Sequence, residues 1–367
     1  MHPFSANKFA VTGANKFANT FMNLTYQSID LALRYPFRIA LMSRTSTPIV
    51  LIQLQLGDFI GFGEASMPPY LGESHASVCA FLDLAHQKII SKIKDLDALH
   101  TIDCQSIMKE IDQLAEGNKA AKAAIDIALH DLKGKIEGRA VWQILGSNPD
   151  KMPLTTCTIG IEMDPSVLKQ KIEDAADFKV LKIKLGSEDD KKLVNLIRQF
   201  TDKPLYVDAN QGWQDVNFAI DMTFWLAEKG VLLIEQPMLK TDLDGNGRVR
   251  EASPLPVFAD ESFQRLADFD AIDGIFDGIN IKLMKSTGLW EAQLMVEKAR
   301  QKNLKIMIGC MSETSCGILA AAALAPQCDF ADLDGPWLIA NNPFQAPILR
   351  GGKIQLSTAA GLGLVNG

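Results

Sequence analysis

The sequence has no long hydrophobic run, no basic run and no cysteine cluster, and each of these absences excludes a class of protein. A membrane helix needs roughly 20 uninterrupted apolar residues, so we expect no membrane partner. The net charge of -7, without a cluster of Lys and Arg, argues against a nucleic-acid partner. The six cysteines lie far apart without metal-ligand spacing, which predicts buried thiols in a reducing cytoplasm.

What is present indicates a globular chain with a large core. Of the 367 residues, 47% are hydrophobic and 22% are charged. At the N-terminus, Ala6-Asn7-Lys8-Phe9-Ala10 recurs as Ala14-Asn15-Lys16-Phe17-Ala18 ahead of Met22. This stretch has no compact apolar segment with a small-residue cleavage site, so a secretory signal is not indicated. We therefore expect residues 1–21 to be a disordered extension and the fold to start near Met22.

Residues 22–150 have the pattern of an α+β domain. Short apolar runs around Gly57-Asp58 predict a sheet rich in hairpins. Helices are expected over 76–93, after Ser74, and over 119–135, where Asn118 would be the N-cap. The pattern changes after Pro153.

From 151 to 340, short apolar strands alternate with amphipathic helices, which predicts βα units and a parallel sheet. Eight strands at a regular spacing indicate an α/β fold, a modified (β/α)8 (TIM-type) barrel with the N-terminal α+β domain as a cap. Residues 340–367 are expected to pack back on that cap. An open doubly wound sheet is the alternative, but no Gly-rich phosphate loop follows the first strand. The expected strands are 154–159, 180–185, 205–207, 232–234, 257–259, 278–283, 305–308 and 329–332.

Acidic residues end three successive strands of this pattern. Asp208, Glu235 and Asp260 each follow an apolar run, one βα unit apart, so their carboxylates should lie side by side on one rim. Three such groups repel one another unless a cation joins them, and carboxylate oxygens are ligands that hard ions prefer. Zinc would ask for His or Cys, and none of the five histidines is near in sequence. We therefore predict one Mg²⁺ per subunit.

Lysines flank the predicted metal site. Lys182 and Lys184 alternate with apolar residues in one strand, so both side chains point the same way, about 7 Å apart. Lys282 lies one strand beyond Asp260 and should face Lys184 across the metal. Two such lysines could remove a proton from one face of a carbon and return it on the other. This arrangement is compatible with racemisation, epimerisation and elimination.

These motifs resemble the enolase superfamily, in particular its muconate-lactonizing-enzyme subgroup, from about Met22 to the C-terminus. The resemblance implies that Asp208, Glu235 and Asp260 bind Mg²⁺, that Lys184 and Lys282 are the acid/base pair, and that Lys182 helps to hold a substrate carboxylate. Homo-oligomers are common among such barrels. The matching segments are Lys182-Ile183-Lys184, Asp208-Ala209-Asn210, Glu235-Gln236-Pro237, Asp260-Glu261-Ser262, Asn280-Ile281-Lys282 and Gly309-Cys310-Met311-Ser312-Glu313.

The last strand narrows the range of possible reactions. Asp332 and Asp334 lie on one face by two-residue alternation and resemble the Asp-x-Asp motif of dipeptide epimerases, in which the pair binds the free ammonium of a dipeptide. By the same resemblance, Thr158 is expected to donate to the substrate carboxylate. Glu313 is a candidate substrate-binding residue, or else a hydrogen-bonding neighbour or an inert rim residue. Asp332 and Asp334 could alternatively cap the short turn that follows.

The N-terminal loops 34–47 and 66–74 are expected to select the substrate side chain, and Arg38 or Arg44 could bind an acidic one. The resemblance implies an arginine at the position of Met42 in Ala-Glu epimerases, and Arg44 lies two residues further on. L-Ala-D/L-Glu is the first expectation, which would place the chain in cell wall peptide metabolism. The alternatives are neutral or hydrophobic dipeptides, a cycloisomerase or dehydratase of the o-succinylbenzoate synthase or muconate cycloisomerase type, a Schiff-base aldolase and a non-catalytic binding protein.

Overall fold

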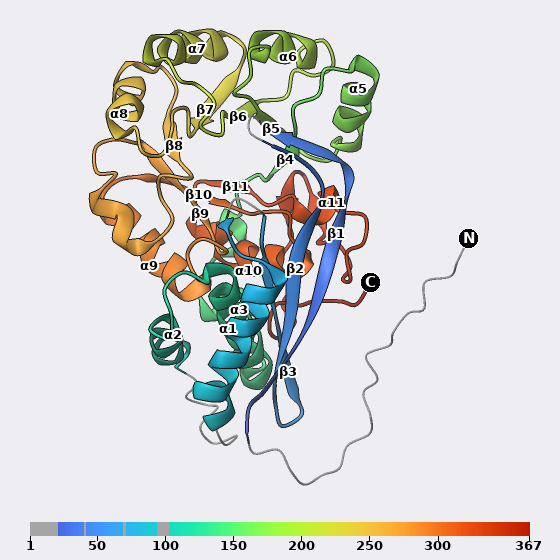
Figure 1. Cartoon of the computed structure of the whole chain (residues 1–367). Coiled ribbons are helices and arrows are strands. Elements are labelled where there is room, and N and C mark those ends of the chain that lie inside the picture. The colour runs from blue at the N-terminus through green and yellow to red at the C-terminus, as the bar shows by residue number, and fades with distance from the viewer. Residues whose placement is uncertain (1–20, 40–41, 69–70, 94–102) are drawn as a thin grey trace.

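The structure is a computed structural model that describes residues 21–39, 42–68, 71–93 and 103–367 (Figure 1). The expected extension, apart from Phe21, therefore lies outside the described residues. The strands are β1 Asn23–Ile39, β2 Met42–Leu56, β3 Phe59–Ser66, β4 Thr156–Ile159, β5 Val180–Lys184, β6 Leu205–Asp208, β7 Val231–Glu235, β8 Val257–Ala259, β9 Gly278–Lys282, β10 Lys305–Gly309, β11 Phe330–Asp332, β12 Leu349–Arg350 and β13 Lys353–Ile354. The α-helices are α1 His75–Lys88, α2 Cys104–Asp112, α3 Lys119–Glu137, α4 Val141–Ile144, α5 Pro165–Asp174, α6 Asp190–Ile197, α7 Val216–Glu228, α8 Leu243–Ala252, α9 Leu289–Gln301, α10 Ser315–Leu324 and α11 Gly335–Leu338.

The N-terminal part is an antiparallel sheet in the order β1-β2-β3 with α3 packed on it. Two glycines of β3 allow the close approach of the helix. A Cβ at Gly61 would lie 2.2 Å from the carbonyl oxygen of Ala128, and one at Gly63 would lie 1.9 Å from that of Ala124. The expected hairpin-rich sheet is present, and its contact with α3 depends on these two positions.

The N-terminus of α3 is capped differently from the prediction. Asn118 has a φ of 48° and its side chain makes no capping hydrogen bond. Instead, the backbone N–H groups of Ala120 and Ala121 donate to the carboxylate of Glu73 at 3.1 and 3.4 Å. A carboxylate at a helix N-terminus accepts from N–H groups that have no partner within the helix. The cap therefore comes from a residue far away in the sequence.

The second part is the predicted barrel. Eight parallel strands follow the order β11-β10-β9-β8-β7-β6-β5-β4, and a bridge between Thr155 and Ala331 brings the two end strands together. The (β/α)8-type prediction is thereby confirmed, and α5 to α8 lie outside the strands in Figure 1. Below the strand ends, one apolar cluster packs in the barrel: Val180, Tyr206, Leu233, Phe258 and Met307. These side chains make a floor beneath the polar rim.

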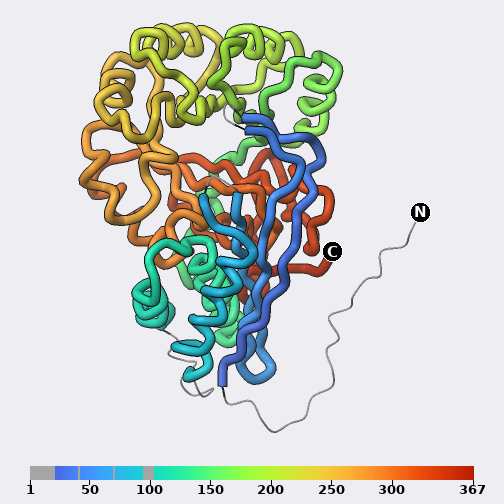
Figure 2. Tube along the Cα trace, in the orientation of Figure 1, coloured from blue at the N-terminus to red at the C-terminus, as the bar shows by residue number. Residues whose placement is uncertain are grey.

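The β1–β2 hairpin and the C-terminal segment connect the two parts. The stretch 34–47 was expected as a loop, but its described residues are strand, with Phe37 paired to Arg44. The hairpin extends from the N-terminal sheet to the barrel beside α5 (Figure 2). Arg38 of β1 is held there because its carbonyl accepts from the N–H of Ile161. The C-terminal segment contacts the N-terminal part where Gly361 accepts from the N–H of Val141 and donates to the carbonyl of Arg139.

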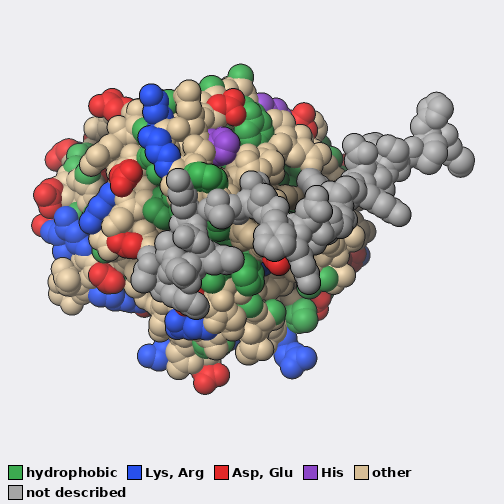
Figure 3. Space-filling view, turned by 90° about the horizontal axis from the view of Figure 1, so that it is seen from below, with side chains coloured by type: hydrophobic (Ala, Val, Ile, Leu, Met, Phe, Trp, Pro, Cys, Tyr) green, Lys and Arg blue, Asp and Glu red, His purple; other side chains and the backbone are tan. Residues whose placement is uncertain are grey.

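The surface shows no concentration of one charge on the face drawn in Figure 3, where acidic and basic side chains are mixed. Within the described ranges, every helix is too short or too polar to cross a membrane.

Candidate active site

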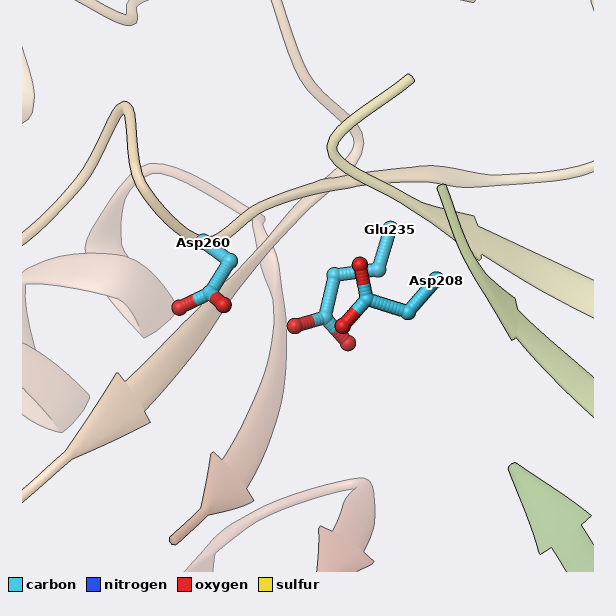
Figure 4. A group of neighbouring side chains, drawn as sticks. All are labelled: Asp208, Glu235 and Asp260. Atoms are coloured by element: carbon cyan, nitrogen blue, oxygen red, sulfur yellow. The ribbon is translucent and has the colours of Figure 1, made fainter. Parts of the chain in front are cut away.

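The strand register brings the three predicted carboxylates to one level of the barrel. Lys184 pairs with Asp208, and Asp208 pairs with Glu235, across β5, β6 and β7. Asp260 follows β8. One oxygen from each of the three carboxylates lies within 4.8 Å of the others, and all three residues are buried (Figure 4).

This group has the chemistry of a site for a hard divalent cation. Glu235 Oε2 is buried and makes no hydrogen bond within the described residues, although the Lys182 ammonium lies 2.7 Å away. Burial, and then the charge of Asp208, raise the pKa of Glu235 to about 7. Burial also raises the pKa of Asp208, but Lys184 and Lys182 outweigh it and bring the pKa to about 2. A cation bound among these oxygens would favour the ionised form of all three carboxylates.

The two proposed acid/base lysines lie on opposite walls. Lys184 Nζ donates to Asp208 Oδ2 at 2.6 Å, and Lys282 Nζ donates to Asp260 Oδ2 at 2.8 Å. Their strands, β5 and β9, are separated by β6, β7 and β8 in the ring of eight. The two ammonium groups therefore approach the carboxylate group from two sides, as the sequence predicted.

Lys182 links the carboxylate group to the last strand. Its ammonium lies 3.3 Å from Asp208, 2.7 Å from Glu235 and 2.8 Å from Asp332. Burial lowers the pKa of Lys182, but these carboxylates outweigh it and hold the pKa well above its ordinary value. The three carboxylates therefore favour the protonated, positively charged form of Lys182.

Asp332 and Asp334 lie where the barrel closes between β11 and β4. Asp332 Oδ1 accepts from the hydroxyl of Thr156 at 2.5 Å, and Asp334 Oδ2 accepts from the backbone N–H of Thr158 at 2.5 Å. Burial and the neighbouring Asp332 raise the pKa of Asp334 to about 7. An arriving ammonium would favour ionisation of Asp334. Thr158 therefore lies at the end of the site where the two aspartates are.

The other two candidates occupy different surroundings. Arg44 donates to Ser312 Oγ at 3.0 Å and lies 5.3 Å from the centre of the Phe37 ring, and Lys184 Nζ lies 6.0 Å from the same ring. Arg44 is therefore at the mouth of the site. Glu313 is buried in the turn between β10 and α10, where its Oε1 accepts from the N–H of Met311 at 2.7 Å.

Sequence reasoning missed two side chains that support the carboxylates. Asn280 Nδ2 donates to Glu235 Oε1 at 2.8 Å. Lys285 is buried, donates to a carboxylate oxygen of Asp260, and also donates to the carbonyls of Asp260, Phe263 and Asn280 at 2.7, 3.1 and 3.1 Å. Asn280 could have been found from its alternation with Lys282, whereas Lys285 lies past the strand end, where no periodicity applies.

Family models match both parts of the chain. Residues 22–146 match the mandelate racemase/muconate lactonizing enzyme N-terminal domain, and residues 167–365 match the enolase C-terminal domain-like family. The chain belongs to the mandelate racemase/muconate lactonizing enzyme family of the enolase superfamily.

Several relatives and solved structures that are similar to this chain are epimerases of dipeptides. The chain is 46% identical to an L-Ala-D/L-Glu epimerase of Bacteroides thetaiotaomicron over 98% of its length and 90% of the relative's. It is also similar in structure to the dipeptide epimerase of Enterococcus faecalis complexed with Mg and L-Leu-L-Tyr, with a TM-score of 0.85, 32% identity, and 93% and 98% of the two chains covered. A substrate-liganded L-Ala-D/L-Glu epimerase of Bacillus subtilis has a TM-score of 0.85 at 28% identity, covering 95% and 99%.

Proposed function

We propose that this protein is a magnesium-dependent dipeptide epimerase, an isomerase that inverts the α-carbon of the C-terminal residue of a dipeptide. One observation carries the proposal. Lys184 and Lys282 lie on opposite sides of the buried group Asp208, Glu235 and Asp260, and the pair Asp332 and Asp334 lies at the closing strand. Such a site could hold a molecule with a carboxylate at one end and an ammonium at the other, and its reacting carbon would lie between the lysines.

Each group of residues has a separate role in the proposed reaction. Magnesium, held by Asp208, Glu235 and Asp260, would stabilise the negative charge that develops on the substrate carboxylate as the α-proton leaves. Lys182 adds a second positive charge at that end. One of Lys184 and Lys282 removes the proton as a general base, and the other delivers a proton to the opposite face. Asp332 and Asp334, beside Thr156 and Thr158, would bind the free ammonium, and Asp332 also lies 2.8 Å from the Lys182 ammonium.

The side chain of the second residue would extend toward the β1–β2 hairpin. Arg44 is half-buried beside Phe37 at the mouth of the site, whereas Arg38 is exposed and its backbone carbonyl faces the β4 end. We therefore propose Arg44 as the group that recognises an acidic side chain and rank L-Ala-D/L-Glu first, ahead of neutral or hydrophobic dipeptides. An arginine–carboxylate contact is charge-assisted and directional, so it would favour glutamate over a neutral residue.

Activity on free and blocked dipeptides tests the proposal. The purified protein with Mg²⁺ should epimerise L-Ala-L-Glu, and the N-acetylated dipeptide should be a poor substrate because it has no ammonium for Asp332 and Asp334. Lys184→Ala and Lys282→Ala should each abolish epimerisation. Full activity in either lysine variant, or equal rates on the N-acetylated dipeptide, would contradict the assignment.

The role of Arg44 has its own test. Hydrogen bonds to charged groups contribute about 1.5–3 kcal/mol, so Arg44→Met should lower kcat/KM for L-Ala-L-Glu by roughly 10- to 150-fold. The same variant should leave kcat/KM for L-Ala-L-Leu within about 3-fold. Arg38→Met is the matched control. A parallel loss on both dipeptides would refute Arg44 as the specificity residue.

Three further expectations belong to this proposal. The six cysteines are free thiols in the structure, as a reducing cytoplasm would keep them. A role in cell wall peptide metabolism would follow from an Ala-Glu substrate. Homo-oligomerisation remains an expectation, which light scattering of the purified protein would test.

A further inference from the structure

A carboxylate of the N-terminal domain caps a helix of the barrel. Asp126 lies in α3, is fully buried, and its Oδ2 accepts from the backbone N–H of Leu289 and, at 3.1 Å, from that of Trp290. These residues open α9. The first N–H groups of a helix have no partner within it, and a carboxylate there also interacts favourably with the helix dipole. The residue before α9 is Gly288, which has no side chain to do this.

The turn between β9 and α9 fits closely around Asp126. A Cβ at Gly288 would lie 2.4 Å from Asp126 Oδ2, and Gly288 has a φ of 113°. Thr287, a β-branched residue, has a φ of 60°, which is an unfavourable conformation for such a side chain. A strained backbone conformation at a residue other than glycine persists only where surrounding contacts hold it in place. The contact with Asp126 is part of what fixes it here.

The same turn begins at Lys282. The N–H groups of Lys285 and Ser286 donate to the carbonyl of Lys282 at 2.9 and 3.0 Å, and the N–H of Gly288 donates to that of Leu283 at 3.0 Å. The turn therefore connects Lys282, at the end of β9, to the start of α9, where Asp126 binds. It is six residues long and contains three hydrogen bonds of its own. A displacement at Asp126 would move the backbone that carries the Lys282 ammonium.

The turn after the other lysine is closed within the barrel. Beyond Lys184, the N–H groups of Gly186 and Ser187 donate to the carboxylate of Asp190, which is the first residue of α6. The indole N–H of Trp213 also donates to Asp190, at 2.8 Å. The turn after Lys282 is thus held from two sides, by the N-terminal domain through Asp126 and by the barrel through Lys285, whereas Asp190 and Trp213 hold the turn after Lys184 from within the barrel.

We propose that Asp126 is a positioning residue for Lys282, so that it controls proton transfer at one face of the substrate α-carbon and not at the other. This inference rests on the proposed function. Loss of Asp126 should weaken proton removal and delivery by Lys282 while Lys184 keeps its geometry.

Isotope exchange distinguishes proton transfer at the two faces of the substrate α-carbon. In deuterium oxide, a substrate whose α-proton faces Lys184 can lose it and regain deuterium from the same lysine, with no inversion, whenever Lys282 delivers slowly. For Asp126→Ala, which removes the acceptor for Leu289 and Trp290, the ratio of exchange without inversion to inversion should rise by about 10-fold for one diastereomer of the dipeptide, because small misplacements of a catalytic group cost about that much or more. For the other diastereomer the ratio should not rise. Lys282→Arg identifies which diastereomer is affected.

Asp131→Ala is the matched control. Asp131 also lies in α3, is fully buried, and accepts from the backbone N–H groups of Phe62 and Leu362 at 2.8 and 2.7 Å, but these belong to β3 and the C-terminal segment. Its loss should destabilise the fold without changing the exchange ratio of either diastereomer. If Asp126→Ala does not fold, Gly288→Ala disturbs the same contact from the turn and should produce the same asymmetry.

The outcomes are distinct. A one-sided rise in Asp126→Ala or Gly288→Ala, absent in Asp131→Ala, supports the inference. Equal changes for both diastereomers, or no change, would show that Asp126 serves stability alone. If the unmodified enzyme exchanges no α-proton of any free dipeptide, the proposed function itself fails, and the positioning role fails with it.

Discussion

Two carboxyl groups are buried where the N-terminal sheet meets α10. Among the described contacts, neither of them forms a salt bridge. Glu64 of β3 accepts from the N–H of Thr314 at 2.9 Å and from that of Gly317 at 3.1 Å, so it caps α10. Glu313 is beside it and accepts from Met311, while a Cβ at Gly317 would lie 2.3 Å from its Oε2. Burial, and then the charge of Glu64, raise the pKa of Glu313 to about 8. Glu313 should therefore be neutral at pH 7 in the folded protein.

The sign of the pH dependence follows from that shift. The ordinary pKa of the group is 4.5, so between this value and about 8 the folded state holds a proton that the unfolded state has lost. The contribution of Glu313 to stability is present in full below the unfolded pKa and is lost as the pH rises through about 8. At about 1.4 kcal/mol per pKa unit the effect has a ceiling of about 5 kcal/mol. Because part of this effect comes from the interaction between Glu313 and Glu64, we expect Glu313 to contribute about 2–3 kcal/mol to the pH dependence of the unfolding free energy.

Glu313→Gln removes this titration while keeping the shape of the side chain and an acceptor for Met311. Relative to the unmodified protein, the variant should gain about 2–3 kcal/mol in free energy of unfolding between about pH 5 and about pH 9. Urea denaturation at both pH values measures it, with the exposed Glu173→Gln as the control. A constant difference between Glu313→Gln and the unmodified protein at both pH values would refute the reasoning.

Further predictions concern packing and the metal. Gly63→Ala should destabilise the fold by more than about 3 kcal/mol, because its Cβ would meet the Ala124 carbonyl at 1.9 Å. Gly247→Ala, in α8 with space around it, should change stability by less than about 1 kcal/mol in thermal denaturation. Asn280→Ala should weaken Mg²⁺ binding by about 10- to 100-fold in calorimetric titration, because Asn280 orients Glu235. Unchanged Mg²⁺ affinity would exclude Asn280 from the metal site.

The barrel and the centre of the site were predictable because both depend on local patterns. Each strand is a short apolar run, and Asp208, Glu235 and Asp260 follow such runs at equivalent points, so the parallel register places them together. Lys182 and Lys184 were found from two-residue alternation in the same way. The structure brings these residues together as the spacing indicated.

What the sequence could not show are contacts between segments that are distant in the chain. Glu73 caps α3 in place of Asn118, and Asp126 caps α9 more than 160 positions away. Neither position carries a periodic signal, because a capping carboxylate from another element needs no particular spacing. The backbone N–H of Thr158 donates to Asp334, a contact that depends on the closure of β11 on β4 and is therefore a property of the complete ring. Donation from Thr158 to the substrate carboxylate stays a prediction.

Proton NMR in deuterium oxide tests the central claim most directly. The purified protein with Mg²⁺ is incubated with L-Ala-L-Glu, and L-Ala-L-Leu and L-Ala-L-Phe are followed in parallel. We predict that the α-proton signal of the second residue disappears while the diastereomer appears, with the α-proton of the first residue unchanged and glutamate preferred. Retention of every α-proton, or formation of a cyclised or dehydrated product in place of the diastereomer, would contradict the assignment as a dipeptide epimerase.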